Sequence, residues 1–434
     1  MIGTGYLGAT HAACLAACGH EVIGIDNDPD RVARLRGGCA PFHEPGLDAL
    51  LRQGVDSAAL GFSTDVTLAG DADVHFLCVG TPQRAGSHAA DLSALDTAVT
   101  ALLPLLEKPC LVVGKSTVPV GTARALGERL RSQTPARDRV RIAWNPEFLR
   151  EGHAVDDSLR PDRLVFGVED DEADRVLRDV YARVINDGVP VVRTDLATAE
   201  LAKVSANVML AARISLVNML AEVCEAADAD VGDLTRILGL DARIGSEFLN
   251  PGVGFGGGCL PKDTRAFAAR AEELDVGQTT AILREVDTIN MRQRARTVDL
   301  AVALLDGRPQ GKRIAVLGGA FKADSDDVRD SPALDVASTL EARGAEVYVH
   351  DPKANANVRR AQPRLHTADS VEEACREADI VLVLTDWEEF RGIDPVALAG
   401  VVRTPRVVDG RLVLDPDKWR AAGWDFHALG RGTR

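Results

Sequence analysis

A cysteine within a glycine-rich stretch is the residue of this sequence with the clearest chemical potential. Cys259 follows Gly256-Gly257-Gly258, and Lys262 and Asp263 stand three and four positions further on. Glycine lets backbone N–H groups come close to a ligand, and a nearby cation favours the thiolate that attacks carbonyl carbon. A packing cysteine beside a glycine turn fits the same residues equally well. Other motifs therefore have to decide between a nucleophile and a core residue.

A dinucleotide-binding fingerprint lies at the other end of the chain. Its glycines are Gly3, Gly5 and Gly8, with Tyr6 and Leu7 between the last two, in the spacing G-x-G-x-x-G. Such glycines permit a tight turn and bring a pyrophosphate to the amino terminus of the helix that follows. The motif predicts dinucleotide binding where a helix, a strand and an acid follow it in that order.

The elements that the fingerprint requires do follow in order. Residues 9–18 are small and helix-like, and 21–26 reads as a strand that ends in Asp26. A carboxylate at this spacing accepts hydrogen bonds from a ribose 2′-hydroxyl and repels a 2′-phosphate, so NAD is favoured over NADP. Arg31 lies close enough in the sequence to soften that preference. The sequence therefore predicts NAD as the cofactor.

The strand that should precede the fingerprint is short. Only Met1 and Ile2 stand before Gly3, whereas a strand in this position needs about five residues. We therefore expect the first strand to be truncated at the centre of the sheet, with a cost to folding and to NAD affinity.

Composition limits the classes of protein. The chain has 434 residues, 46% hydrophobic residues and a formal net charge of −15. The length predicts two or three domains, and the negative charge argues against a nucleic-acid partner. No apolar run approaches transmembrane length and no signal peptide opens the chain, so no membrane partner is expected. Eight scattered cysteines without paired zinc spacing predict a cytoplasmic protein with no metal site.

Strand-like and helix-like runs alternate through the first 195 residues. This alternation is typical of a parallel sheet covered by helices. After residue 26, the strand-like runs of this part are 74–79, 110–114, 140–144 and 164–168. Continuous helical periodicity then covers 196–229, and a second long helix is expected over 279–305. The middle of the chain is therefore predicted to be helical, with the Cys259 stretch between its two long helices.

The last third of the chain starts a second nucleotide-type fold. Strands are expected at 313–318, 346–352, 380–385 and 406–410, but the segment lacks a full G-x-G-x-x-G. The predicted fold class is α/β, with two Rossmann-like doubly wound domains joined by a central helical domain that contains a long helix. The expected domains are 1–195, 196–306 and 312–434. Two such folds predict two nucleotides, one that oxidises and one that belongs to the substrate.

Several motifs together resemble the UDP-glucose/GDP-mannose dehydrogenase family, over essentially the whole chain and in family order. No single motif carries the resemblance. The similar stretches are 3–8, Gly80-Thr81-Pro82, Lys115-Ser116-Thr117-Val118-Pro119-Val120-Gly121, Asn145-Pro146-Glu147-Phe148-Leu149-Arg150-Glu151-Gly152, 248–263 and Ala320-Phe321-Lys322.

The resemblance implies a four-electron oxidation of a sugar-nucleotide primary alcohol to the uronic acid, with two NAD used in turn. Cys259 would hold the aldehyde as a thiohemiacetal and then as a thioester. Lys203 and Asn207 stand four apart on one predicted helix face and would stabilise the tetrahedral species. Thr117, Glu147 and Asp263 would supply proton transfer, and the base among them is left open.

The resemblance also implies two sets of binding residues. Those expected at the NAD site, beyond the fingerprint and Asp26, are Arg31, Thr81, Ser116, Thr117, Glu151, Lys262 and Arg329. Those expected at the substrate are Glu147, Phe148, Leu149, Arg150, Glu151, Lys203, Asn207, Arg243, Phe248, Asn250, Gly254, Phe255, Gly256, Lys322 and Arg411. Because the family supplies an arginine such as Arg243 to the neighbouring subunit, a homodimer is expected.

The identity of the sugar nucleotide stays open at this point. UDP-glucose is the first candidate, and dTDP-glucose, GDP-mannose and UDP-N-acetylmannosamine are the alternatives. A two-electron hydroxyacid-type dehydrogenase would share the first domain and the helical middle, but would need neither Cys259 nor a third domain. A non-catalytic sensor of nucleotide sugars would be expected to lose Cys259 or Lys203, and both are present.

Overall fold

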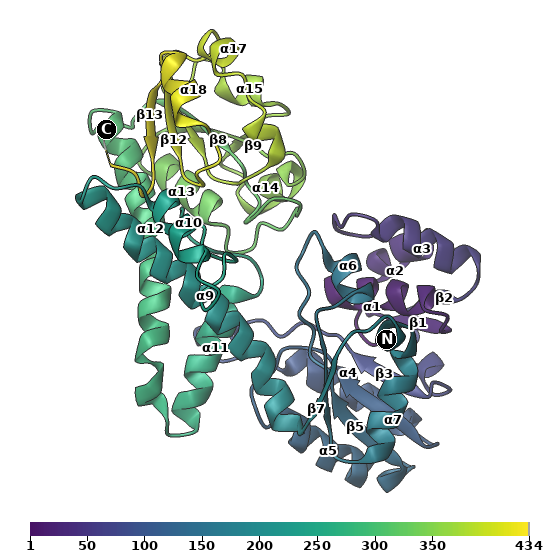
Figure 1. The fold of residues 1–434 in the computed structure, drawn as a ribbon. Coiled ribbons are helices and arrows are strands. Elements are labelled where there is room, and N and C mark those ends of the chain that lie inside the picture. Colours follow the sequence, from purple (N-terminus) through teal and green to yellow (C-terminus); the bar gives the residue numbers. More distant parts are fainter. Residues whose placement is uncertain (433–434) are drawn as a thin grey trace. The chain divides into compact units, whose positions relative to one another are not determined.

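A computed structural model describes residues 1–432 of the chain. They form two compact units, each described here by itself. The first comprises Met1–Ala206 with Ala266–Asp275, and the second comprises Asn207–Arg265 with the chain from Val276 onward. Figure 1 shows both units and labels many of their helices and strands.

The first unit is built on a sheet in two parts. A five-stranded part has the order β3-β4-β5-β6-β7, and a two-stranded part pairs β1 with β2. The bounds are β1 (Val22–Ile25), β2 (Leu60–Ser63), β3 (Val74–Leu77), β4 (Cys110–Gly114), β5 (Val140–Trp144), β6 (Leu164–Val168) and β7 (Val191–Thr194). The sheet is parallel except between β5 and β6, which pair antiparallel. This reversal departs from the all-parallel sheet expected from the alternation, because strand direction leaves no mark on hydrophobic runs that are buried on both faces.

The residues before the fingerprint occupy the place of a first strand over a very short length. Ile2 bridges in parallel to Ile25 of β1 on one side and to Leu77 of β3 on the other. The N–H of Ile2 donates to the carbonyl of Phe76 at 2.8 Å, and the N–H of Gly3 donates to that of Ile25 at 2.8 Å. The two parts of the sheet therefore meet through these few residues alone.

Helices pack against both parts of this sheet. They are α1 (Tyr6–Ala17), α2 (Pro29–Arg36), α3 (Leu47–Asp56), α4 (Ser93–Leu102), α5 (Thr122–Gln133), α6 (Ala154–Leu159), α7 (Asp171–Val180) and α8 (Ala182–Asn186). Local signals fix several starts: Asp28 caps α2 through hydrogen bonds from the N–H groups of Asp30 and Arg31, with Pro29 at the first helical position. Such caps satisfy backbone donors that the helix itself leaves unpaired.

The middle of the chain is helical, as predicted. Its helices are α9 (Leu196–Ala226), α10 (Val231–Gly239), α11 (Leu260–Glu273) and α12 (Ala281–Leu304). By length and composition alone, α9 is apolar enough to cross a membrane, so the expectation that no run approaches that length was wrong. However, α9 carries buried polar residues such as Glu200, Lys203 and Asn218. Glu200 accepts hydrogen bonds from the N–H groups of Gly121 and Ala123, as expected of a helix that packs within a folded protein.

The second unit contains a six-stranded sheet in the order β10-β9-β8-β11-β12-β13, with every pair parallel. Counted along the chain from β8, this is the 3-2-1-4-5-6 order of a doubly wound nucleotide fold. The strands are β8 (Arg313–Leu317), β9 (Glu346–His350), β10 (His366–Thr367), β11 (Ile380–Val383), β12 (Arg406–Asp409) and β13 (Asp425–Ala428). The helices between them are α13 (Pro332–Ala342), α14 (Asn355–Ala361), α15 (Val371–Cys375), α16 (Glu388–Arg391), α17 (Pro395–Ala399) and α18 (Pro416–Ala421).

Candidate functional site

The fingerprint glycines of the first unit are required by close packing. Gly3 has a φ of +86°, and a Cβ on Gly8 would lie 1.9 Å from the carbonyl oxygen of Gly3. A Cβ on Gly5 would meet nothing within 4 Å, so open space lies in front of the residue that precedes α1. A helix amino terminus with open space before it is suited to a pyrophosphate. These residues fit the dinucleotide that the sequence predicts.

Asp26 stands at the end of β1 with its carboxylate buried. It accepts hydrogen bonds from the Thr4 N–H at 2.7 Å and the Thr4 hydroxyl at 3.0 Å. Arg31 Nη1 lies 2.9 Å from Asp26 Oδ1. Burial by itself would raise the pKa of Asp26, but the hydrogen bonds from Thr4 and Asp28 and the Arg31 guanidinium outweigh it and lower the pKa. Asp26 is therefore a firmly ionised acid, and it engages Arg31.

Replacing Asp26 with asparagine should narrow the preference for NAD over NADP. The amide keeps the size of the side chain and an acceptor for Thr4, but removes the repulsion of a 2′-phosphate and releases Arg31. We expect the ratio of kcat/KM with NAD to kcat/KM with NADP to fall by about tenfold or more, a loss of about 1.4 kcal/mol in discrimination between the two cofactors. Initial rates with each cofactor measure it. The double variant Asp26→Asn/Arg31→Met should lose the gained NADP activity, and an unchanged ratio in Asp26→Asn would contradict the role of Asp26.

Two loops at the carboxyl ends of β3 and β4 are tied together. The Thr81 hydroxyl donates to the Thr117 carbonyl at 2.7 Å, and the Ser116 hydroxyl donates to the Val79 carbonyl at 2.7 Å. Thr81 and Ser116 are buried, whereas Thr117 is partly exposed. Ligands of open α/β sheets bind beyond the carboxyl ends of the strands, so these residues lie where the sequence analysis places the cofactor.

The segment 145–152 follows β5 and carries most of the predicted substrate residues of this unit. Lys203 Nζ lies 3.0 Å from Glu147 Oε1; the Lys203 side chain is buried, with 5% exposed, and the Glu147 side chain is mostly buried, with 13% exposed. The other Glu147 oxygen accepts the Leu149 N–H at 2.6 Å. The Arg163 guanidinium stacks on the ring of Phe148, with its central carbon 3.8 Å from the centroid of that ring. Arg150 is exposed and pairs with Asp157 at 2.7 Å.

A buried lysine holds the first residue of the segment 145–152 in place. Lys115 Nζ donates to Asn145 Oδ1 at 3.0 Å, and the Tyr181 hydroxyl donates to the same oxygen at 2.6 Å. The Asn145 amide in turn donates to the Val165 carbonyl at 2.9 Å. Burial, opposed in part by nearby Cys78 and Glu147, lowers the pKa of Lys115 to about 8. Asn145 is thereby fixed at the start of the segment that carries Glu147.

The lowered pKa of Lys115 predicts a specific pH dependence of stability. The unfolded lysine holds its proton up to about 10.5, whereas the folded one releases it near 8. Unfolding therefore takes up a proton between these values, so the contribution of Lys115 to the free energy of unfolding rises with pH in that window. Relative to Lys115→Met, wild-type stability should increase by about 1 kcal/mol between pH 8 and pH 9.5.

Urea unfolding at the two pH values measures this difference. Lys108→Met, which removes a charge from a half-exposed lysine of the same unit, is the control and should show no such divergence. If the free energy of unfolding changed with pH in the same way in Lys115→Met and in the wild type, the lowered pKa of Lys115 would be contradicted.

The glycines before Cys259 are dictated by packing within the second unit. Cβ atoms on Gly256, Gly257 and Gly258 would lie 2.1 Å from the Asp330 carbonyl oxygen, 2.8 Å from the Phe321 ring and 2.5 Å from the Arg329 guanidinium. The Gly257 N–H donates to the Arg329 carbonyl at 3.0 Å. Within this unit the stretch therefore packs against the loop after β8. A larger side chain would clash with the Asp330 backbone at Gly256 and with the Phe321 ring at Gly257, whereas at Gly258 it would meet the end of the exposed Arg329 side chain, which can move.

Cys259 itself is exposed, although residues 251–257 are buried. It directly precedes α11, and its carbonyl accepts the Asp263 N–H at 2.9 Å. The amino terminus of a helix favours negative charge. The other seven cysteines include five buried ones, of which Cys14, Cys78 and Cys375 have pKa values raised by burial to about 12. Exposure and position both separate Cys259 from these inert thiols.

Asp263 lies one helical turn beyond Cys259 and joins two other predicted residues. Its carboxylate accepts the Asn207 amide at 2.6 Å, and Lys262 Nζ lies 2.5 Å from its other oxygen. Asp263 is 2% exposed and Asn207 is 6% exposed. The second unit therefore brings Asn207, Lys262 and Asp263 together on α9 and α11.

Residues 252–255 are fixed by hydrogen bonds from several elements. The Gly252 N–H donates to the Asn218 side chain at 2.8 Å, and the side chain of Asn290 pairs with both the N–H and the carbonyl of Phe255. Arg411 Nη1 donates to the Gly254 carbonyl at 3.0 Å. Arg411 is thereby placed against the predicted substrate loop, within one unit.

The acid of the second nucleotide fold is used internally. Asp351, which follows β9, accepts the N–H groups of Gly319 at 2.8 Å and Ala320 at 2.9 Å, and the Trp387 indole N–H at 3.1 Å. Its counterpart Asp26 is the residue predicted to bind a ribose. This fold lacks the full G-x-G-x-x-G fingerprint, so it is not suited to a second dinucleotide.

A cavity of about 660 Å³ lies beside two predicted substrate residues, Asn250 and Arg411. Its lining also contains the guanidinium-bearing residues Arg236, Arg391 and Arg431.

The remaining predicted substrate and cofactor residues of the second unit lie on its loops. Lys322 is half-buried, and its Nζ lies 5.8 Å from the centroid of the Phe321 ring. Phe248 has a φ of +58°. Arg243 and Arg329 are exposed and pair with Asp241 and Asp327.

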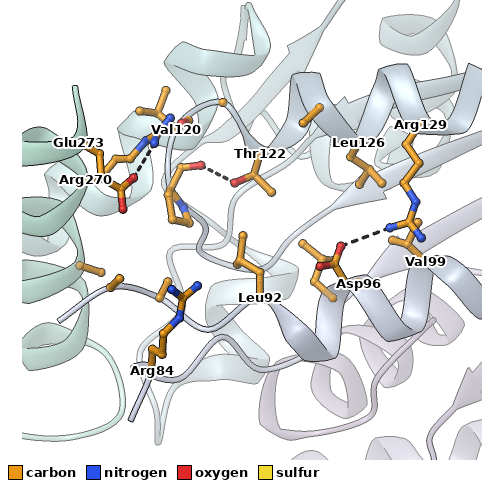
Figure 2. Close-up of a pocket in the computed structure, with 17 residues that line it drawn as sticks. Arg84, Leu92, Asp96, Val99, Val120, Thr122, Leu126, Arg129, Arg270 and Glu273 are labelled. Atoms are coloured by element: carbon orange, nitrogen blue, oxygen red, sulfur yellow. Dashed lines mark hydrogen bonds and ion pairs between the residues drawn. The ribbon is translucent and has the colours of Figure 1, made fainter. Parts of the chain in front are cut away.

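A second cavity, of about 470 Å³, lies in the first unit between α4, α5 and part of α11, and its lining contains none of the predicted site residues. Figure 2 shows two ion pairs at this cavity, Asp96 with Arg129 and Arg270 with Glu273. Because these arginines are already paired with acids, the cavity offers little net positive charge to an anionic ligand.

Each unit holds part of the predicted constellation. The first brings Lys203 to Glu147 and places Asp26 beside the fingerprint, and the second brings Asn207, Lys262 and Asp263 together near Cys259. Three further residues, Lys115, Glu200 and Glu44, were not predicted from the sequence. Glu44 stands between Pro41 and Pro45 in a turn-rich stretch, and an acid between prolines is the only sequence signal that it offers.

Family models match three successive parts of the chain, and all three belong to the same protein family. The NAD binding domain of the UDP-glucose/GDP-mannose dehydrogenase family matches residues 1–185, its central domain matches 197–292 and its UDP binding domain matches 315–416. UDP-glucose 6-dehydrogenase of Rhizobium meliloti is 39% identical over 434 residues, covering 99% of each chain. That of Pseudomonas aeruginosa is 40% identical over 442 residues, covering 99% of this chain and 97% of the relative.

A solved structure shows the same fold. The UDP-glucose dehydrogenase of Pyrobaculum islandicum superposes with a TM-score of 0.91 at 36% identity, covering 99% of this chain and 96% of that one. The matched domains make the chain a dehydrogenase with an NAD binding part and a UDP binding part. It belongs to the UDP-glucose/GDP-mannose dehydrogenase family. The predicted resemblance, fold class and NAD cofactor are confirmed.

Proposed function

We propose that this protein oxidises UDP-glucose to UDP-glucuronate with NAD. The observation that carries the proposal is the exposed thiol of Cys259 at the start of α11, in a stretch packed against the UDP binding part. The relatives that match nearly the whole chain are UDP-glucose 6-dehydrogenases. Conversion of an alcohol to a carboxylate removes four electrons, and NAD, when bound, accepts a hydride in each of two oxidations.

The proposed mechanism assigns a role to each group. The alcohol loses a proton and a hydride to give an aldehyde. The Cys259 sulfur adds to the aldehyde carbon to form a thiohemiacetal, which loses a second hydride and a proton and becomes a thioester. Water then attacks the thioester carbon, releasing the carboxylate and the thiol. Covalent capture retains the aldehyde between the two oxidations.

The remaining residues stabilise charge and move protons in this proposal. Lys203 and Asn207 donate to the oxygen that becomes negative in the tetrahedral species. Glu147, paired with Lys203, accepts a proton from the attacking water. Thr117 and Asp263 belong to the proton relay. The other residues assigned to NAD and to the sugar nucleotide in the sequence analysis keep those roles as part of the same proposal.

The stoichiometry of the reaction tests the function. A limiting amount of UDP-glucose with excess NAD should yield two NADH per sugar, read as absorbance at 340 nm, together with one acid. One NADH per sugar with released aldehyde would contradict the four-electron reaction and favour a two-electron dehydrogenase. The same assay with dTDP-glucose, GDP-mannose and UDP-N-acetylmannosamine identifies the preferred nucleotide sugar.

We further propose a homodimer formed through the central helices. Large apolar side chains on α9 are exposed: Met209 is 64% exposed, Leu216 is 54% and Val223 is 58%. Leu240, just after α10, is 79% exposed. Exposed apolar stripes of this kind mark protein interfaces. Arg243, whose side chain is 89% exposed, would reach the neighbouring active site.

The three-domain division at 1–195, 196–306 and 312–434 is also proposed, with the matched family domains in its support. A cytoplasmic location is proposed because all eight cysteines are thiols, as in a reducing compartment.

A further inference from the structure

A buried carboxylate outside the predicted site joins two parts of it. Glu44 is 6% exposed. One of its oxygens accepts the Ala154 N–H at 2.7 Å, and the other accepts the Gly152 N–H at 2.7 Å and the hydroxyl of Tyr6. The Gly152 N–H also lies 3.1 Å from the Tyr6 hydroxyl oxygen. All four residues belong to the first unit.

The two ends of this link lie in different binding regions. Tyr6 is the first residue of α1 and follows Gly5, where open space is suited to a pyrophosphate. Gly152 ends the segment that carries Glu147 and the predicted substrate residues 148–151. A shift of α1 on cofactor binding would therefore move the Tyr6 hydroxyl, which donates to Glu44 and accepts from the Gly152 N–H.

The chemistry of the link makes it sensitive to small displacements. The partners of Glu44 among these contacts are neutral donors, so each hydrogen bond carries a substantial share of the stabilisation of the buried charge. Burial first, and then the hydrogen bond and the charge of Glu44, raise the pKa of Tyr6 above its ordinary value. Tyr6 therefore remains a protonated donor. Its ring also packs against Phe42, with centroids 4.7 Å apart.

We propose that Tyr6 and Glu44 are a positioning pair that couples binding of the dinucleotide to placement of the sugar-binding segment. The inference rests on the proposed function, because it requires both ligands. Cofactor binding at α1 holds the Tyr6 hydroxyl in place, Glu44 holds Gly152 and the start of α6, and the segment 147–151 is set for the sugar nucleotide. Such coupling is reciprocal, so each ligand raises the affinity for the other by the same factor.

The test uses NADH with UDP-glucose, a pair that binds without turnover. NADH fluorescence titrations with and without saturating UDP-glucose give the coupling factor. We expect at least about fivefold tighter NADH binding with the sugar in the wild type, and less than about twofold in Tyr6→Phe, which lacks the donor. Glu44→Gln should behave similarly, because its amide NH₂ would face the Gly152 N–H. Phe42→Leu, which alters packing but no hydrogen bond, should retain the coupling.

Steady-state kinetics separate positioning from general damage. In steady-state assays, KM for UDP-glucose should rise about fivefold in Tyr6→Phe, whereas Phe42→Leu should keep the wild-type KM. Coupling retained in Tyr6→Phe, or absent from the wild type, would overturn the inference. Failure of the proposed function is distinct: it appears as no NADH production by the wild type from any of the four sugar nucleotides, in which case the coupling does not exist and the inference falls with it.

Discussion

Replacing Cys259 with serine should reduce turnover at saturating substrate by at least about a thousandfold, while leaving binding of both ligands nearly intact. The serine hydroxyl is close in shape to the thiol, but it is a far poorer nucleophile near neutral pH, and an ester formed on it would hydrolyse slowly. The variant should therefore stall with a covalent sugar adduct that intact-mass spectrometry detects. Cys259→Ala should form no adduct, although slow oxidation of the hydrated aldehyde can persist.

The exposure of Cys259 also predicts how the two variants affect thermal stability. Because the Cys259 side chain is exposed, neither variant should change the melting temperature appreciably. A packing cysteine predicts the reverse, with normal turnover for serine and a marked loss of stability. Cys39 is exposed in the first unit, so Cys39→Ser is a matched control that should retain full activity. Near-normal turnover by Cys259→Ala would exclude the covalent mechanism.

The strands were predictable where both faces of the sheet are covered. The apolar runs at 110–114, 140–144 and 164–168 coincide with β4, β5 and β6, residue for residue. Their side chains are buried on both faces, so hydrophobicity alone marks the bounds. The antiparallel direction of β6 was not predictable, because it depends on the path of the connection from β5 through α6 and leaves no periodic signal.

The site was predictable where a motif has one chemical use. Asp26 stands at the expected spacing, and its position beside the fingerprint follows from the βαβ arrangement alone. The glycines before Cys259 illustrate the opposite case. They were interpreted as giving access to the thiol, yet Gly256 and Gly257 are required by contacts with Asp330 and Phe321, residues more than sixty positions away that no local pattern identifies.

The supporting residues were missed for a related reason. Lys115 was part of a recognised motif but received no role, because a lysine in a sequence is by default a surface residue. Its burial depends on the convergence of Asn145 and Tyr181 from later in the chain. Residues that act through others are therefore visible only after the fold brings their partners together.

Lys203 offers the second test with a large expected effect. Its ammonium group is buried and pairs with the mostly buried carboxylate of Glu147 at 3.0 Å. Removing a donor that stabilises a developing oxyanion typically costs a factor of about 10² to 10³ in kcat. Lys203→Met should therefore lose at least about a hundredfold in kcat. The variant should also be destabilised by about 3 kcal/mol, because it leaves the Glu147 charge buried without its cation.

The two effects can be separated by removing both charges. In Lys203→Met/Glu147→Gln no uncompensated charge remains, so the free energy of unfolding should return to within about 1 kcal/mol of the wild type. Activity should stay low, because neither the cationic donor nor the proton acceptor is restored. Urea unfolding and initial rates on the two single variants and the double variant complete the cycle. Recovery of activity together with stability would show that Lys203 serves only to neutralise Glu147.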